Sequence, residues 1–178
     1  NTSPSRIVNV DKTPPTVILQ HPPNNLHIKS TQVTFKFNAT DNFDVEMECS
    51  LYINGVLNQT ASLRAGSKEL TVTGFSEGLY VWEVRCKDYV NIGYSERRRI
   101  VIDTTPPSIT LISPANGSVT DNSAPTFNFY VTDNLSPTLN CSLIINSAFE
   151  NLEKSTVFDK GYASITSDKL VDGDKNWK

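Results

Sequence analysis

Apolar and polar residues alternate along most of the chain, at the period of two that half-buried strands require. Residues 16–20, after the first double proline, predict one strand. Residues 33–39 predict a second strand, with Val33, Phe35 and Phe37 on its inward face. No long window keeps the stripe of an amphipathic helix. The alternation therefore predicts an all-β chain.

Four further segments have the same pattern. The inward side chains of the segment before the Asn54-Gly55 hairpin turn are Met47, Cys49, Leu51 and Ile53. Later strands are predicted at residues 68–74, 79–88 and 96–103, and in the second of these Tyr80, Trp82, Val84 and Cys86 share one face. About seven short strands in roughly 90 residues are typical of an immunoglobulin-like or fibronectin III-like β-sandwich.

The chain also repeats itself. Asp-Lys-Thr-Pro-Pro from Asp11 and Asp-Thr-Thr-Pro-Pro from Asp103 are offset by 92 residues, and the same offset pairs Phe35 with Phe127. After a small insertion the register returns at Trp82 and Trp177, with an offset of 95. A period of about 92 residues is the size of one small domain. Tandem sandwiches are therefore predicted.

The repeat register predicts the domain boundaries. Residues 1–10 are similar to the segment that precedes the second copy, so we expect them to be the last strand of a preceding repeat or a linker. Residues 11–102 form one complete repeat, and residues 103–178 form a second that is incomplete at its C-terminal end. The double prolines restrict the backbone before each repeat to extended geometry, which stiffens the linker. We therefore expect this chain to be a portion of a longer protein.

Composition excludes some functions. The chain is 38% hydrophobic and 20% charged, with a net charge of −3. This charge does not favour nucleic acid, and no apolar run is long enough to insert into a bilayer. We therefore expect this chain neither to bind nucleic acid nor to insert into a membrane.

Three cysteines are explained by the repeat. Cys49 and Cys86 lie on the inward faces of the segment before the Asn54-Gly55 turn and of residues 79–88, the third and sixth strands of the predicted seven-strand sandwich, and Cys141 is the second copy of Cys49. The partner of Cys141 would fall beyond Lys178. We therefore expect a Cys49–Cys86 disulfide, across neighbouring strands of one sheet, which implies an oxidising compartment. The alternative is a pair of buried free thiols.

These motifs together resemble the Ig-like repeats of large prokaryotic surface proteins, among them bacterial giant adhesins and archaeal cell-surface glycoproteins. They are the two Asp-x-Thr-Pro-Pro linkers, the Thr-Asp-Asn triplets at Thr40 and Thr132, the hairpin after Cys49, and Trp-x-Val-x-Cys-x-Asp from Trp82. Many family members have Asp-x-Ala-Gly-Asn where this chain has Asp-Tyr-Val-Asn from Asp88. The resemblance implies an extracellular, cell-surface location. Such repeats serve as spacers, adhesive tips or accessory modules, so the fold alone does not decide the function.

Motifs for catalysis are not found. His21 and His27 lie in a polar connection without ligands at metal-like spacing, and there is no nucleophile elbow, phosphate loop or zinc-protease motif. We therefore expect no enzymatic activity and no required cofactor.

Acidic residues favour a calcium site. The sandwich topology brings the start of the first strand and two later loops to one pole, where it gathers Asp11, Asp41, Asp44 and Asp88. Calcium prefers six to eight oxygen ligands from such loops. Large adhesins with similar repeats use calcium between domains, so the resemblance supports this hypothesis. The alternative is that these aspartates only stabilise turns.

Glycosylation is a second hypothesis. Asn-x-Ser/Thr acceptor motifs begin at Asn38, Asn58, Asn116 and Asn140, among others. The alternation places Asn38 and Asn140 on outer faces. The alternative is that Asn, Ser and Thr are simply common on turn-rich surfaces.

Two other groups have both a functional and a structural interpretation. Arg97, Arg98 and Arg99 alternate faces, and Glu96 and Asp103 dilute their charge. We interpret them as edge-strand charges that prevent unwanted pairing, rather than as a binding patch. Tyr89 and Tyr94 are candidates for stacking on a sugar or for contact with a partner, although such pairs also occur by chance.

The predicted function is therefore structural: a non-catalytic extracellular repeat of a long cell-surface protein, in an adhesin stalk, a sheath or a filament. Its expected partners are neighbouring repeats, other copies of itself or surface glycans. One alternative is an accessory or carbohydrate-binding module of a secreted enzyme. Another is a subunit that polymerises by strand exchange.

Overall fold

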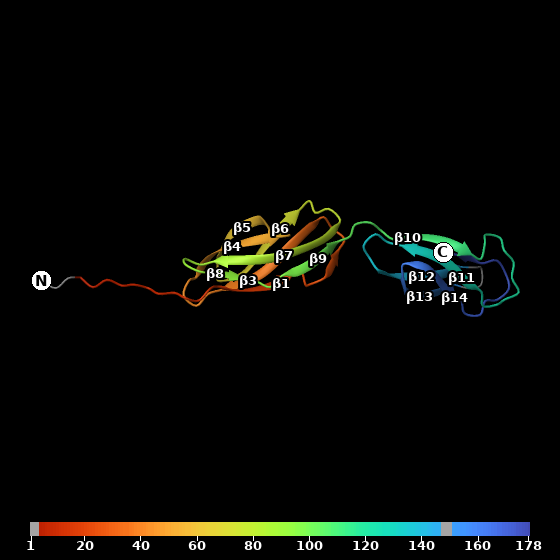
Figure 1. The fold of residues 1–178 in the computed structure, drawn as a ribbon. Coiled ribbons are helices and arrows are strands. Elements are labelled where there is room, and N and C mark those ends of the chain that lie inside the picture. The colour runs from red at the N-terminus through yellow and green to blue at the C-terminus, as the bar shows by residue number, and fades with distance from the viewer. Residues whose placement is uncertain (1–3, 147–150) are drawn as a thin grey trace. The chain divides into compact units, whose positions relative to one another are not determined.

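The computed structural model describes residues 4–146 and 151–178, in which every regular element is a β-strand (Figure 1). The chain divides into two compact units, Asn1–Thr104 and Thr105–Lys178. No helix suited to crossing a membrane occurs in the part of the chain that the structure describes. The prediction of an all-β chain is confirmed.

The first unit is an Ig-like or fibronectin III-like sandwich of two sheets. One sheet has the order β1-β3-β6, and the other has the order β2-β9-β7-β4-β5, with β8 paired to β7. The bounds of these strands are β1 (Thr16–His21), β2 (Leu26–Ile28), β3 (Gln32–Thr40), β4 (Glu46–Ile53), β5 (Val56–Arg64), β6 (Gly66–Thr73), β7 (Gly78–Lys87), β8 (Ile92–Tyr94) and β9 (Arg98–Ile102).

A single hydrophobic core joins the two sheets. Phe35 of β3 and Trp82 of β7 are fully buried, and their rings meet edge to face with centroids 4.9 Å apart. Because the two residues belong to opposite sheets, this contact holds the sandwich closed. The inward faces predicted from the alternation are the ones that the core uses.

The interpretation of β9 as an edge strand is wrong. Leu26–Ile28 of β2 pairs in parallel with Ile100–Ile102, so β9 lies between β2 and β7. The alternation does not predict β2, because a strand of three residues is too short to establish a pattern. Arg97, just before β9, and Arg98 and Arg99 within it are therefore not explained as edge-strand charges.

The second unit repeats the pairing of the first. Leu111 pairs with Phe129 as Leu19 pairs with Phe37, and in both units the register shifts at the next residue. Its two sheets have the orders β10-β11-β14 and β13-β12-β15. The bounds of the strands are β10 (Ser108–Ser113), β11 (Thr126–Thr132), β12 (Thr138–Asn146), β13 (Asn151–Asp159), β14 (Gly161–Thr166) and β15 (Asn176–Trp177).

The segment before β1 forms no strand between residues 4 and 15. Ile7, Val8 and Val10 are exposed, and residues 1–3 lie outside the described residues. The assignment of residues 1–10 to a preceding repeat or a linker stays a prediction.

A close contact holds the end of this segment against the sandwich. Gly93 of β8 lies directly beneath Pro15, and a Cβ atom on Gly93 would be 1.8 Å from the Pro15 carbonyl oxygen. Gly93→Ala is therefore expected to lower the free energy of unfolding of the first unit by about 1–3 kcal/mol, the usual cost of overpacking. Urea unfolding measures this change. The exposed neighbour Ile92 provides the control, because Ile92→Val should shift the midpoint little. An unchanged midpoint for Gly93→Ala would contradict the contact.

Candidate functional site

Four aspartates converge at one pole of the first unit. Asp11 precedes β1, Asp41 and Asp44 lie in the loop between β3 and β4, and Asp88 follows β7. One carboxylate oxygen from each residue lies within 4.8 Å of the others. Among the side chains that the structure describes, this is the one such group of three or more acids, histidines or cysteines. These are the four residues that the sequence places at this pole.

Local backbone contacts fix the direction of two of these carboxylates. Asp41 Oδ1 accepts hydrogen bonds from the backbone N–H groups two and three residues further on, both at 2.8 Å. Asp88 Oδ1 accepts in the same way from Val90, at 2.7 Å, and from Asn91. Such turns are the structural role that the sequence also allows. They occupy only one oxygen of each carboxylate.

The second oxygen of each of these carboxylates is buried without a partner. Asp41 Oδ2 and Asp88 Oδ2 accept no hydrogen bond, and Asp88 as a whole is 6% exposed. A buried carboxylate oxygen without compensation is costly. Burial by itself raises the pKa of Asp88, but the backbone N–H groups of Asn91 and Val90 outweigh it and hold the pKa below its ordinary value. Asp88 is therefore charged at neutral pH, and one of its two oxygens is buried without a hydrogen-bond donor.

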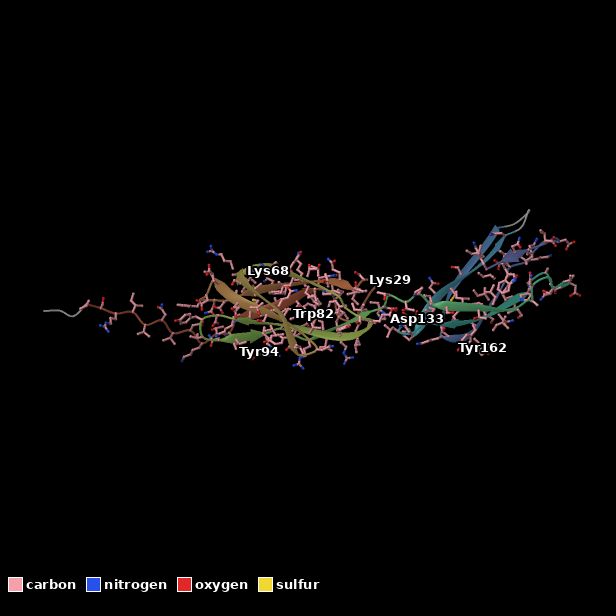
Figure 2. All side chains as sticks on the ribbon, turned by 90° about the horizontal axis from the view of Figure 1, so that it is seen from above. Lys29, Lys68, Trp82, Tyr94, Asp133 and Tyr162 are labelled. Carbon is pink, nitrogen blue, oxygen red and sulfur yellow. A yellow bond between two sulfur atoms is a disulfide. The ribbon has the colours of Figure 1, made fainter. Side chains whose placement is uncertain are left out.

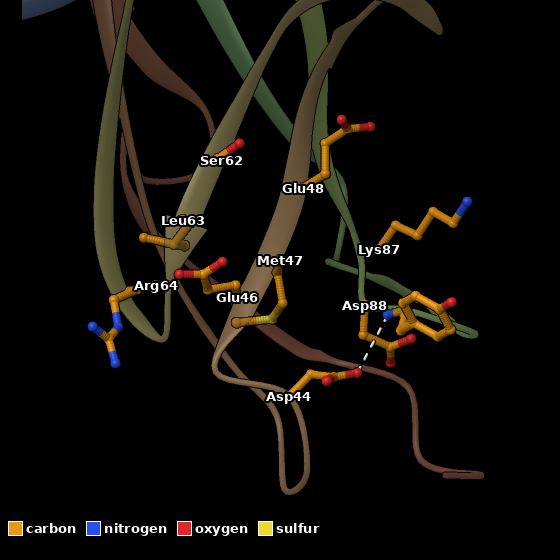
Figure 3. Close-up of a pocket in the computed structure, with 10 residues that line it drawn as sticks. Asp44, Glu46, Met47, Glu48, Ser62, Leu63, Arg64, Lys87 and Asp88 are labelled. Carbon is orange, nitrogen blue, oxygen red and sulfur yellow. Dashed lines mark hydrogen bonds between the residues drawn. The ribbon is translucent and has the colours of Figure 1, made fainter. Parts of the chain in front are cut away.

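The other two aspartates connect separate segments. Asp44 Oδ2 accepts a hydrogen bond from the backbone N–H of Tyr89 at 3.3 Å, across from Asp88 (Figure 3). Asp11 Oδ2 accepts one from the side-chain amide of Asn91 at 3.2 Å. The cluster therefore links the segment before β1, the β3–β4 loop and the β7–β8 turn.

The donor set fits calcium. Four carboxylates with their negative charges so close repel one another unless a cation compensates them. Calcium binds carboxylates through one or both oxygens and tolerates irregular loop geometry, whereas magnesium demands an octahedron. The cluster contains no cysteine or histidine, the ligands that favour zinc. Asp11, Asp41, Asp44 and Asp88 are the residues that would hold the ion.

One side of the cluster opens to solvent. Asp44 and Asp88 form part of the wall of a groove of about 720 Å³, together with Met47, Lys87 and Tyr89 (Figure 3). Tyr89 is almost completely exposed at the rim. Two of the four aspartates therefore contribute to the wall of this groove.

The disulfide joins the residues that the repeat register predicts. Cys49 of β4 and Cys86 of β7 are directly opposite each other in one sheet, with Cα atoms 4.0 Å apart, and both are fully buried. Cys141 is a free, buried thiol, and burial raises its pKa. Its side chain behaves as part of the apolar core of the second unit.

The predicted glycosylation acceptors differ in accessibility. Asn58 is exposed and is the extra residue of a β-bulge in β5, between Leu57 and Gln59 in the pairing with β4. Asn116, after β10, and Asn140, on β12, are also exposed. Asn38 on β3 is half-buried, and the hydroxyl of Ser67 lies 3.5 Å from its side-chain oxygen. Attachment of a glycan stays a prediction at all four positions.

A buried ion-pair cluster on β7 was not predicted from the sequence. Glu83 is on the outer face of β7, yet it is only 7% exposed because Arg85 and Arg97 cover it. Glu83 and Arg85 alternate with the inward residues of β7, which places them on one face. The alternation along β7 does not predict that Arg97 contacts Glu83. Arg97 lies beside β7 only because β9, which follows it directly, pairs with β7.

Comparisons with known proteins concern the fold alone. No protein-family model matches the chain, and no curated protein matches it. The structure is similar to fibronectin(III)-like modules of CbhA from Clostridium thermocellum, with 14% identity and a TM-score of 0.48, over 91% of this chain and 83% of that chain. It is also similar to a bacterial ice-binding adhesin, with 18% identity and a TM-score of 0.43, over 88% of this chain and 55% of that chain. For CBD12 from CALX1.2 the identity is 7% and the TM-score 0.37, over 84% and 74% of the two chains.

Proposed function

We propose that this chain is a non-catalytic structural part of a long extracellular cell-surface protein, such as an adhesin stalk, a sheath or a filament, and that its first unit binds calcium. The observation that carries the proposal is the convergence of four aspartates from three chain segments, with two buried carboxylate oxygens that lack partners. A protein of this kind needs rigid modules rather than reactive groups.

The disulfide supports the extracellular part of the proposal. A bond between two fully buried cysteines persists in an oxidising compartment. Exposed acceptor motifs at Asn58, Asn116 and Asn140 are compatible with a glycosylated surface protein.

The structural part follows from the position of Asp11. This residue belongs to the segment that enters the first unit, and four positions later Pro15 packs on Gly93. An ion held by Asp11 together with Asp44 and Asp88 would fasten this segment to the sandwich at a second point. The entering chain would then be held at a defined position instead of moving freely.

Calcium is expected to raise the melting temperature of the first unit in the full chain. A ligand at about 100 times its dissociation constant stabilises the folded state by ~2.7 kcal/mol, which corresponds to several degrees for a unit of this size. Calorimetry in excess calcium and in EDTA measures the shift, and magnesium should produce less of it. The proposal would be overturned by identical melting curves in calcium and EDTA.

Two variants make this experiment specific. Asp88→Asn retains an oxygen for the turn but loses the charge, so it should abolish the calcium-dependent shift. The matched control is Asp133→Asn in the second unit, because Asp133 Oδ1 accepts the same pair of turn hydrogen bonds, from Leu135 and Ser136. In Asp133→Asn, calcium should still raise the melting temperature of the first unit as it does in the parent chain.

A further inference from the structure

The outer face of the larger sheet of the first unit carries a second cluster of side chains, apart from the acidic pole. We call it the tyrosine–arginine face. Its members come from β4, β7, β8 and the region of β9 and are Tyr52, Arg85, Tyr94, Arg97 and Arg99. Tyr94 lies at the surface of this unit (Figure 2) and is 63% exposed.

A buried carboxylate organises this face. Glu83 accepts hydrogen bonds from Arg85 through Oε1 and from Arg97 through Oε2, the latter at 2.7 Å. Burial alone raises the pKa of Glu83, but the hydrogen bonds from the two arginines outweigh it and keep the pKa below its ordinary value. Glu83 is therefore an anion that holds two guanidinium groups in fixed positions.

Tyrosine rings hold Arg85 from two sides. Its guanidinium carbon lies 3.9 Å from the centre of the Tyr52 ring and 5.5 Å from that of Tyr94. Both distances are in the range of cation–π contacts. The hydrogen bonds to Glu83 and the two rings together order side chains that would be mobile on an ordinary strand surface.

The face has an excess of positive charge although the chain as a whole is negative. Arg97 is 72% exposed and uses its Nε for Glu83, and Arg99 projects to the same side two residues further on. Arg98 points to the opposite side, where it donates hydrogen bonds to the carbonyl oxygens of Leu19 and Pro22.

The nearby acid Glu96 does not neutralise this face. Its carboxylate pairs with Arg98 at 2.7 Å. The carboxylate of Glu96 is therefore directed at Arg98 and not at Arg97 or Arg99. The tyrosine–arginine face contains three arginines, and Glu83 pairs with two of them, Arg85 and Arg97.

We propose that the tyrosine–arginine face binds an acidic polysaccharide. Its anionic groups would meet Arg97 and Arg99, and a sugar ring would lie against Tyr94. The charges are complementary, and tyrosine and arginine are the residues that combine stacking with hydrogen bonding at binding surfaces. An extended peptide is less suited, because β9 and β7 are paired on both sides and offer no free edge for strand addition.

The test measures binding of the full chain to immobilised polygalacturonate, with heparin as a sulfated acidic glycan and dextran as a neutral one. Binding to one or both acidic glycans but not to dextran, weakened by added salt, is expected. Arg99→Glu should weaken it at least about fivefold, since each exposed charge contact contributes modestly. The Arg99 backbone N–H, and not its side chain, makes the hydrogen bond to Asn24, so this variant should fold normally. Tyr94→Ala should weaken binding as well.

Matched controls separate this proposal from other sources of binding. Arg64→Glu makes the same charge change at an exposed arginine on the far edge strand β5 and should leave binding unchanged. Binding in EDTA should equal binding in calcium, which separates this face from the acidic pole. Three results would overturn the proposal: absence of binding to both acidic glycans, equal affinity for Arg99→Glu and the parent chain, or equally tight binding to poly-glutamate.

Discussion

Replacing Cys49 and Cys86 together by alanine is expected to lower the free energy of unfolding of the first unit by about 3–4 kcal/mol. The disulfide joins residues that are 37 positions apart in the sequence. Closing a loop of this length lowers the conformational entropy of the unfolded chain, and the loss corresponds to about 3–4 kcal/mol. This is a large part of the stability of a small domain. Because both sulfur atoms are fully buried, the substitution also removes core contacts.

The two tryptophans allow this loss to be assigned to one unit. Trp82 lies in the first unit and Trp177 in the second, so a Trp177→Phe background makes fluorescence specific for the first unit. Urea unfolding then gives the change directly. Cys141→Ala is the control and should leave the transition of the first unit in place. An equally stable double variant would contradict the structural role of the bond.

Phe35→Ala is expected to lower the stability of the first unit by about 3–5 kcal/mol. The Phe35 ring is fully buried and packs edge to face on Trp82 with centroids 4.9 Å apart, so its removal leaves a cavity between the two sheets. The same fluorescence measurement applies. Phe43→Ala is a matched control, because Phe43 is 51% exposed and its truncation should change stability by about 0.5 kcal/mol or less. Similar losses for the two variants would contradict the assignment of the core.

The sequence predicted the parts of this fold that depend on long alternation. Phe35, Leu51 and Trp82 lie on faces repeated over several residues, so their burial follows from the period alone. The pairing of Cys49 with Cys86 followed from the repeat, which identified Cys141 as a copy of Cys49. The acidic pole was also predictable, because strand topology decides which loops meet.

Other features depend on contacts that no local pattern contains. The short strand β2 pairs with β9, so β9 is not at the edge of its sheet, and the interpretation of Arg97–Arg99 as edge-strand charges is wrong. The burial of Glu83 requires Arg97, 14 positions further on, to lie beside β7. Gly93 was not singled out because a strand glycine has several uses, and only the path of Pro15 shows which one applies.

The most direct test of the account is the number of calcium ions bound by the full chain, measured by isothermal titration calorimetry. A single calcium site at the acidic pole predicts one ion for the parent chain, one for Asp133→Asn, and none for Asp88→Asn at the same concentrations. No binding by the parent chain, or unchanged binding by Asp88→Asn, would contradict it and would leave the aspartates as turn-forming residues only.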